Sequence, residues 1–240
     1  MVTEAQRNKL AQRLMKPRSR DAGTADPRLL TALAVDDLGE RLEQTVAALE
    51  DSRLIVPLFP HARPDSLEAA QAEDDDREDL AGTTVVRLDG RRRAMATFSS
   101  VDALARTYPD ARPAPMSVTR ACLVALAGPA RLIIDSSVVL PRPAVAALAQ
   151  KDHWLPAWRD RELADLIDAE LADLGIRGVR IEPVEPARDR VLIPVPCADQ
   201  QAARALLAQA TTRLAGMPRL IAATDTIELA PVLAERDGEK

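Results

Sequence analysis

The spacing of apolar positions predicts a chain of short helices and strands that begins near residue 27. A stripe with the i, i+4, i+8, i+11 spacing of one helix face is formed by Leu38, Leu42, Val46 and Leu49. The run SRLIVPLFP at 52–60 is apolar and rich in branched side chains, as in a buried strand. Helical and strand-like segments then continue to about residue 150. They predict a mixed-sheet α/β or α+β domain over 27–150.

A β-hairpin is predicted around Asp89 and Gly90, because this pair separates the strand-like runs TTVVRL and RRAMATFS. Side chains of a strand alternate between its faces, so Arg91 and Arg93 should point one way and Arg92 the other. The three arginines therefore indicate the solvated start of a strand rather than a flat nucleic-acid patch. Phe98, farther along the same strand, is expected to face the core.

The last third of the chain predicts a second, smaller domain. Asp160 is placed to cap the helix RELADLIDAELADLG. This helix is followed by the strands RGVRIEPVEP and DRVLIPVP, a further helix and the strand DTIELAPVL. The order α-β-β-α-β indicates a two-layer fold, ferredoxin-like in part. The expected division is a peripheral extension at 1–26, a domain at 27–150, a linker at 151–160 and a domain at 161–240.

Composition narrows the classes of function. Apolar residues make up 47% of the chain, enough for a sizeable core, and the net charge is −5. A mildly acidic protein does not attract phosphate backbones as a whole, so nucleic-acid binding is not expected. There is no run of 18 apolar residues, so no membrane span is expected. The first residues lack the apolar stretch of a signal peptide, and a cytoplasmic location is the expectation.

Metal and cofactor chemistry is not expected either. The only histidines, His61 and His153, stand far apart, and Cys122 and Cys197 have apolar neighbours typical of buried free thiols. The acidic run at 73–76 reads as part of a solvated loop over 61–80, with an oxygen-only metal site as the alternative. No phosphate-binding glycine motif and no serine nucleophile motif occurs. We therefore expect no catalytic constellation and no cofactor.

Two groups of residues are candidates for binding. Asp135 follows the strand-like LIID, where open sheets place ligands, and Arg92 or Arg112 could join it in a strand-end cleft; a simple turn is the alternative. Trp154 and Trp158 stand four residues apart in the linker. They either fill a seam between the two domains or expose at least one ring to a partner, with Arg112 at the rim.

Several segments taken in order resemble the SseB-like (enhanced serine sensitivity) family, in its actinobacterial form. The segments are ADPRLLTALA, SRLIVPLFP, DGRRRAMATFSSVDALARTYPDARPAP and VLPRPAVAALAQKDHWLPAWRD, and they cover about residues 25–160. The motifs in these segments are structural: a hairpin turn, a helix cap and an extended proline segment. The resemblance implies an SseB N-terminal-like domain and no defined reaction, so it implies no catalytic residue. Ser99 where threonine is usual, an added N-terminal helix and the insertion at 61–80 depart from the pattern.

Two classes of function follow. The first is a non-enzymatic interaction or regulatory protein with an unidentified protein partner, or with a second copy of itself. The second is a small-ligand-binding protein or enzyme with a strand-end cleft. A deep pocket with converging polar groups favours the second class, and a flat apolar patch favours the first.

Overall fold

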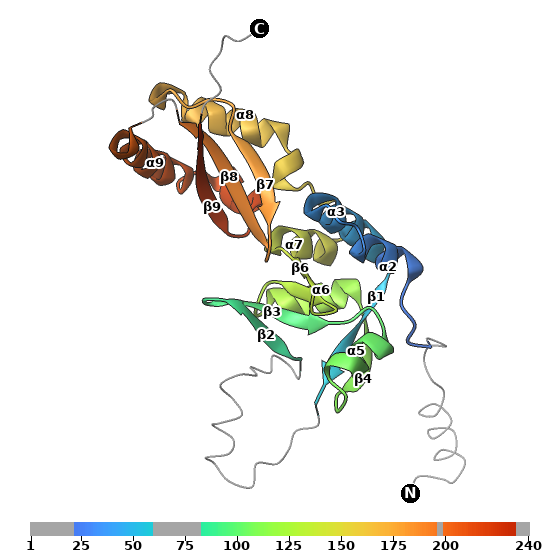
Figure 1. Cartoon of the computed structure of the whole chain (residues 1–240). Helices are drawn as coiled ribbons and strands as arrows, with labels where there is room; N and C mark the ends of the chain where they lie inside the picture. The colour runs from blue at the N-terminus through green and yellow to red at the C-terminus, as the bar shows by residue number, and fades with distance from the viewer. Residues whose placement is uncertain (1–21, 60–82, 196–198, 234–240) are drawn as a thin grey trace, which may run out of the picture.

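The computed structural model describes residues 22–59, 83–195 and 199–233, which form two units placed end to end (Figure 1). The N-terminal unit contains α2 (Pro27–Leu33), α3 (Leu38–Leu49), β1 (Arg53–Leu58), β2 (Val85–Asp89), β3 (Arg92–Thr97), α5 (Val101–Thr107), β4 (Arg112–Ser117), α6 (Val118–Leu126), β5 (Leu132–Ile134), β6 (Val138–Leu140) and α7 (Arg142–Gln150). The C-terminal unit contains η1 (Ala157–Arg159), α8 (Arg161–Glu170), η2 (Ala172–Leu174), β7 (Arg180–Val184), β8 (Arg188–Val195), α9 (Gln200–Leu214), α10 (Pro218–Ala223) and β9 (Ile227–Leu233). Mixed sheets with helices packed on them make an α+β fold, as expected.

The sheet of the N-terminal unit has the order β2-β3-β5-β6, and only the pair β3 and β5 is parallel. Strand β1 pairs with β4 in a separate antiparallel ribbon. The ribbon joins the sheet through Ile55 and Phe98, whose main-chain N–H and C=O groups are exchanged at 2.8 Å. The buried run predicted at 52–60 is therefore β1, at the junction of the two layers.

The outer edge of β4 is built from alternate prolines. Ile55 directs its main-chain groups toward Phe98, away from β4. Its partner in the ladder is Pro115, and Pro113 lies opposite Pro57 two residues farther on. Hydrogen-bonding direction alternates along a strand, so the nitrogens of Pro113 and Pro115 face away from β1. These two positions of the edge carry no N–H group.

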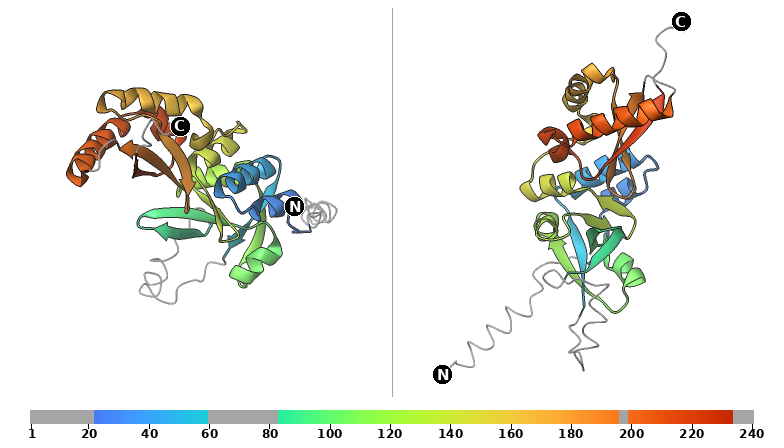
Figure 2. Two further views of the ribbon diagram at one scale, coloured as in Figure 1. Left: turned by 45° about the horizontal axis from the view of Figure 1, so that its top comes forward. Right: turned by 90° about the vertical axis from the view of Figure 1, so that its left-hand side faces the viewer.

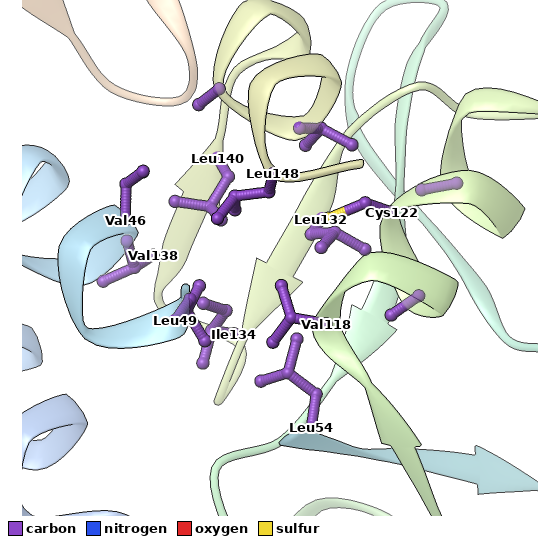
Figure 3. Close-up of a cluster of buried hydrophobic side chains, with 14 of the residues drawn as sticks. Val46, Leu49, Leu54, Val118, Cys122, Leu132, Ile134, Val138, Leu140 and Leu148 are labelled. Atoms are coloured by element: carbon purple, nitrogen blue, oxygen red, sulfur yellow. The ribbon is translucent and has the colours of Figure 1, made fainter. Parts of the chain in front are cut away.

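The main core of the N-terminal unit lies between its sheet and helices α2, α3, α6 and α7. Figure 3 shows Leu49 of α3, Ile134 of β5 and Leu148 of α7 among the side chains that converge there. The helix stripe predicted from the sequence contributes three buried side chains to this core, namely Leu42, Val46 and Leu49. Their removal from water is the main driving force for docking α3 on the sheet.

A second, smaller cluster packs α5 against the junction of β1 and β3. Phe98 is 1% exposed there, which confirms the prediction that it faces the core. Tyr108 makes edge-to-face contacts with Phe98 at 5.8 Å and with Phe59 at 5.6 Å between ring centroids. Such perpendicular pairs are favourable for aromatic rings, so Phe59, Phe98 and Tyr108 form one packed aromatic group.

In the C-terminal unit, helices cover one face of the sheet β7-β8-β9 (Figure 2). Strand β8 alternates strictly between buried and half-buried positions, with Val191 and Ile193 facing the core beneath α8 and α9. Its pairing with β7 is antiparallel and with β9 parallel. The predicted elements are present, but α10 is additional. This helix is a turn and a half long with Pro218 at its first position, too short to show a periodic apolar pattern.

The predicted helix cap at Asp160 is confirmed, because its side chain accepts from a main-chain N–H group in the first turn of α8. Asp37 and Ser100 cap α3 and α5 in the same way. The added N-terminal helix expected from the sequence lies outside the described residues, as do the acidic run at 73–76, His61 and Cys197. The division of the chain into four parts stays a prediction.

Candidate functional site

The side chain of Asp135 has a local structural role. It follows β5 with a left-handed φ of 49°, and its carboxylate accepts from the main-chain N–H and the hydroxyl of Ser99 at 2.8 and 2.6 Å. The N–H of Asp135 in turn donates to Thr97. The carboxylate therefore ties the end of β5 to the second residue after β3. This is the turn-forming alternative, with Ser99 as a specific partner.

Arg92 lies at the opposite end of the sheet from Asp135. Strands β3 and β5 are parallel, with Met95 beside Leu132, so their carboxyl ends meet at Asp135. Arg92 begins β3 and is separated from that end by five residues, roughly 17 Å of strand. The strand-end cleft predicted from Asp135 and Arg92 is therefore not formed by these two side chains.

The two tryptophans make an edge-to-face pair, with ring centroids 5.5 Å apart. Trp154 is buried in the main core of the N-terminal unit. Trp158 is half-buried against the same core, and its indole N–H donates to the carboxylate of Glu43 at 2.8 Å. Arg159 donates to the same carboxylate at 2.9 Å. The pair thus fastens the linker to α3 through Trp158 and to the N-terminal core through Trp154.

Arg112 does not join the tryptophans. It begins β4, opposite Leu58 at the end of β1. Its side chain is exposed there. The predicted rim around the tryptophan pair depended on the proline segment packing against the linker, and that segment pairs with β1 instead.

Two arginines hold the turn between β7 and β8 against the N-terminal unit. Arg92 donates to the carbonyls of Pro186 and Ala187 at 2.7 and 2.9 Å, while Asp89 pairs with its guanidinium on the hairpin side. The Arg92 guanidinium in return holds the pKa of Asp89 below its usual range. Arg41 of α3 donates to the carboxylate of Glu185 at 3.1 Å. Arg92 therefore positions the C-terminal unit.

A second polar contact between the units centres on Asp225. Its carboxylate pairs with Arg131 and accepts from the main-chain N–H of Arg142 at 2.9 Å. The side chain of Arg142 continues to the carbonyls of Ile221 and Thr224. A carboxylate that is 1% exposed is thereby satisfied by a guanidinium and a main-chain donor from the other unit. We refer to Asp225, Arg131 and Arg142 as the Asp225 cluster.

The hairpin is confirmed, but its turn lies one residue later than predicted. Asp89 ends β2, and Gly90 and Arg91 form the turn, with φ of 48° at Gly90. A bulge between Arg87 and Asp89 shifts the register, so that Arg87 lies directly opposite Arg93. A one-residue shift exchanges the faces of a strand. Without the bulge, the side chain of Arg87 would lie on the same face of the hairpin as Arg92. With the bulge, it lies on the same face as Arg93.

The result is a basic surface that the sequence analysis missed. An open hollow of about 350 Å³ is lined by Arg87, Gly90, Arg91 and Arg93, with no carboxylate among these residues. We call it the hairpin hollow. Arg91 and Arg93 share this face and Arg92 points away to Pro186, as the alternation predicts. The missed member is Arg87, because the bulge has no clear signal in TTVVRL.

Cys122 is fully buried in the main core, and burial raises the pKa of its thiol to about 12. It is therefore an inert packing residue, as expected for this cysteine. Among the described residues no three His, Cys, Asp or Glu side chains gather into a group that could hold a metal ion. Of the helices described, none is long and apolar enough to cross a membrane.

The arrangement defines an α+β protein whose hairpin extends from a mixed sheet and exposes arginines on one face. The family model of the SseB protein N-terminal domain matches residues 27–155, more than half of the chain. The chain therefore belongs to the SseB family, and the resemblance seen in its sequence motifs is confirmed. Neither the curated proteins nor the solved structures compared with the chain gave a match.

Proposed function

We propose that the protein is a non-enzymatic interaction protein of the SseB family, with a regulatory role, that binds a protein partner through the hairpin hollow. The hollow supports this proposal because two of its lining arginines, Arg87 and Arg91, are exposed, on a hairpin that extends from the sheet (Figure 1). The other candidates have structural roles: Asp135 bonds Ser99, Arg92 holds the β7–β8 turn and Trp154 is core. Trp158 donates to Glu43, so the proposed surface excludes both tryptophans; it also excludes Arg112, which is exposed but does not line the hollow.

The experiment is affinity capture from the native host with the intact protein as bait. Baits carrying Arg87→Glu, Arg91→Glu or Arg112→Glu change the net charge by the same amount, so the last variant is a matched control. A partner of the hairpin hollow should be recovered with the wild-type and Arg112→Glu baits and lost with the other two. Equal recovery by all four baits would contradict the proposed site.

Self-association is a separate outcome of the same proposal. Sedimentation of the purified protein measures it directly, and a mass above one chain that Arg91→Glu abolishes would make the partner a second copy. The proposed location is the cytoplasm, and fractionation of host cells tests it. A protein recovered with the membrane or secreted fraction would contradict that part of the proposal.

A further inference from the structure

We infer that two copies of the chain associate through the outer edge of β9, with the two β9 strands antiparallel about a two-fold symmetry axis at Ala230. The inference is independent of the hairpin hollow and goes beyond the proposed function. Strand β9 ends the sheet β7-β8-β9, and its printed strand partner is β8 on one side. An edge strand presents main-chain groups that can pair with a strand of another molecule.

The hydrogen bonds to β8 determine which main-chain groups of β9 point outward. Asp189 of β8 donates its main-chain N–H to the carbonyl of Thr226, and it lies beside Ile227 in the register of the two strands. Hydrogen-bonding direction alternates along a strand, so the even-numbered residues of β9 bond to β8. The residues whose main-chain groups point away from β8 are Ile227, Leu229, Pro231 and Leu233.

These outward groups are accessible to a second molecule. Within the described part of the chain, the N–H groups of Ile227, Leu229 and Leu233 donate to no main-chain acceptor outside the sheet. Main-chain groups without a protein partner are normally in contact with water. Pro231 is the one outward position of β9 that lacks a donor, whereas two successive outward positions of β4 are prolines. The β9 edge is therefore much less blocked than the β4 edge.

The β9 edge is complementary to itself when Ala230 lies on the axis. Ile227 then lies opposite Leu233 of the second copy, and two such residues exchange both of their main-chain hydrogen bonds. Leu229 lies opposite Pro231 of the second copy and donates to its carbonyl. The missing donor of Pro231 therefore removes one hydrogen bond from this pair without disturbing the register. Each pair occurs twice about the axis, so the whole length of β9 is used.

The side chains favour a second copy as the occupant. Leu233 is 81% exposed, far more than the other large apolar side chains described. Residues directly opposite each other in an antiparallel pair have side chains on the same face. Leu233 would therefore pack beside Ile227 of the second copy, which lies at the border of the C-terminal core. One strand supplies both the exposed side chain and the apolar position that covers it.

Charge selects this register from its neighbours. With Ala230 on the axis, Glu228 lies opposite Val232 of the second copy, and no like charges meet along the strand pair. A register centred on Glu228 would place two carboxylates directly opposite each other, which is destabilising. At the axis itself the two strands approach closely, and the small side chain of Ala230 allows this approach.

Sedimentation equilibrium of the purified full-length protein tests the association, and a dimer should form as the concentration rises from about 1 to about 100 µM. Leu233→Lys should raise the dissociation constant of the dimer at least about tenfold, because it places a charge in the covered position. Leu123→Lys is the matched control: Leu123 is 56% exposed on α6, in the N-terminal unit. This control should stay within about twofold of the wild type.

Disulfide cross-linking tests the register, in a Cys197→Ser background in which the remaining Cys122 is buried. Ala230→Cys places two thiols directly opposite each other, with Cα atoms about 4.5 Å apart, within the range of a disulfide. Val232→Cys is the control, because its two Cα atoms would be about 13 Å apart, four residues along the strands. Oxidation followed by non-reducing gel electrophoresis should give a covalent dimer with Ala230→Cys alone.

Thermal melting at low concentration separates lost association from lost folding, and Leu233→Lys should melt like the wild type because its side chain is exposed. If it melts earlier, the cross-linking of Ala230→Cys decides the matter. A monomer throughout the concentration range, or cross-linking of Val232→Cys as fast as that of Ala230→Cys, would overturn the inference. A dimer that Arg91→Glu abolishes would also overturn it, because self-association would then lie at the hairpin hollow.

Discussion

The main-chain N–H of Asp225 donates to the carboxylate of Asp189 at 3.0 Å, which brings two acidic side chains together where the units meet. Asp225 has Arg131 as its counterion. Asp189 is 4% exposed, and its carboxylate faces a single main-chain donor from Asp225. Burial, together with the charge of Asp225, raises the pKa of Asp189 from 3.8 to about 6, although the hydrogen bond opposes the shift.

This pKa predicts a stability contribution that depends on pH. The folded state holds the proton of Asp189 more tightly than the unfolded state does. Its contribution is therefore fully present below pH 3.8 and is lost as pH rises through about 6. Asp189→Asn keeps an oxygen acceptor for the N–H of Asp225 and removes the titration. Across this window, the free energy of unfolding of the wild type should fall relative to the variant by at most about 3 kcal/mol.

Urea unfolding at a series of pH values measures that difference. The comparison with Asp189→Asn is needed because Asp26, Asp89 and Asp173 have lowered pKa values and lose their contributions as pH falls. Those carboxylates are common to both proteins and cancel. A constant difference between pH 4 and pH 7 would show that Asp189 is not protonated preferentially in the fold.

Substitutions of Trp154 and Trp158 should lower the free energy of unfolding by different amounts. Trp154→Ala removes a core side chain and should lower the free energy of unfolding by about 3 to 5 kcal/mol. Trp158→Phe keeps a ring against Trp154 and removes the hydrogen bond to Glu43, which should cost about 1 kcal/mol. Denaturant unfolding of both variants tests the assignment. An unchanged midpoint for Trp154→Ala would mean that this ring is not part of the core.

Gly90 should be required for its backbone conformation rather than for space. A Cβ atom at this position would meet no atom within 4 Å, but the φ of 48° is in the left-handed region. Gly90→Ala should therefore cost about 1 kcal/mol, and Gly90→Asn less, since asparagine tolerates this region. Equal stability of the two variants would contradict the turn conformation.

Cys122 should be protected from alkylation in the native protein. Its burial and its pKa of about 12 leave almost no thiolate at pH 8. In a Cys197→Ser background, iodoacetamide should modify Cys122 only as fast as the protein unfolds, and mass spectrometry in increasing urea measures this. Rapid labelling without denaturant would show that the core opens locally around α6.

The elements that were predictable from sequence are those specified by local chemistry. Ser100 and Asp160 cap helices because a short polar side chain precedes an amphipathic run, and Gly90 stands between two apolar strands. The bulge near Arg87 was not predictable in this way. The bulge depends on the pairing register of β2 and β3, and this register determines which arginines share a face of the hairpin.

The candidate site also depended on strand direction, which residue patterns alone do not give. Asp135 and Arg92 are both near strand ends, and only the parallel pairing of β3 with β5 shows that the ends are opposite ones. Likewise, Asp225 was not a sequence candidate, because its partners Arg131 and Arg142 come from the other unit. Both the separation of Asp135 from Arg92 and the partners of Asp225 are therefore determined by contacts between segments that are distant in the sequence.

The alternate prolines of β4 have a consequence for association. An open sheet edge can template growth by accepting a strand from another molecule, and this is a common route to aggregation. Pro113 and Pro115 remove the donors at two successive outward positions, so an added strand would leave its own carbonyls unpaired there. Prolonged assembly through this edge is therefore disfavoured, and the protein can keep a short ribbon at its surface without forming fibres from it.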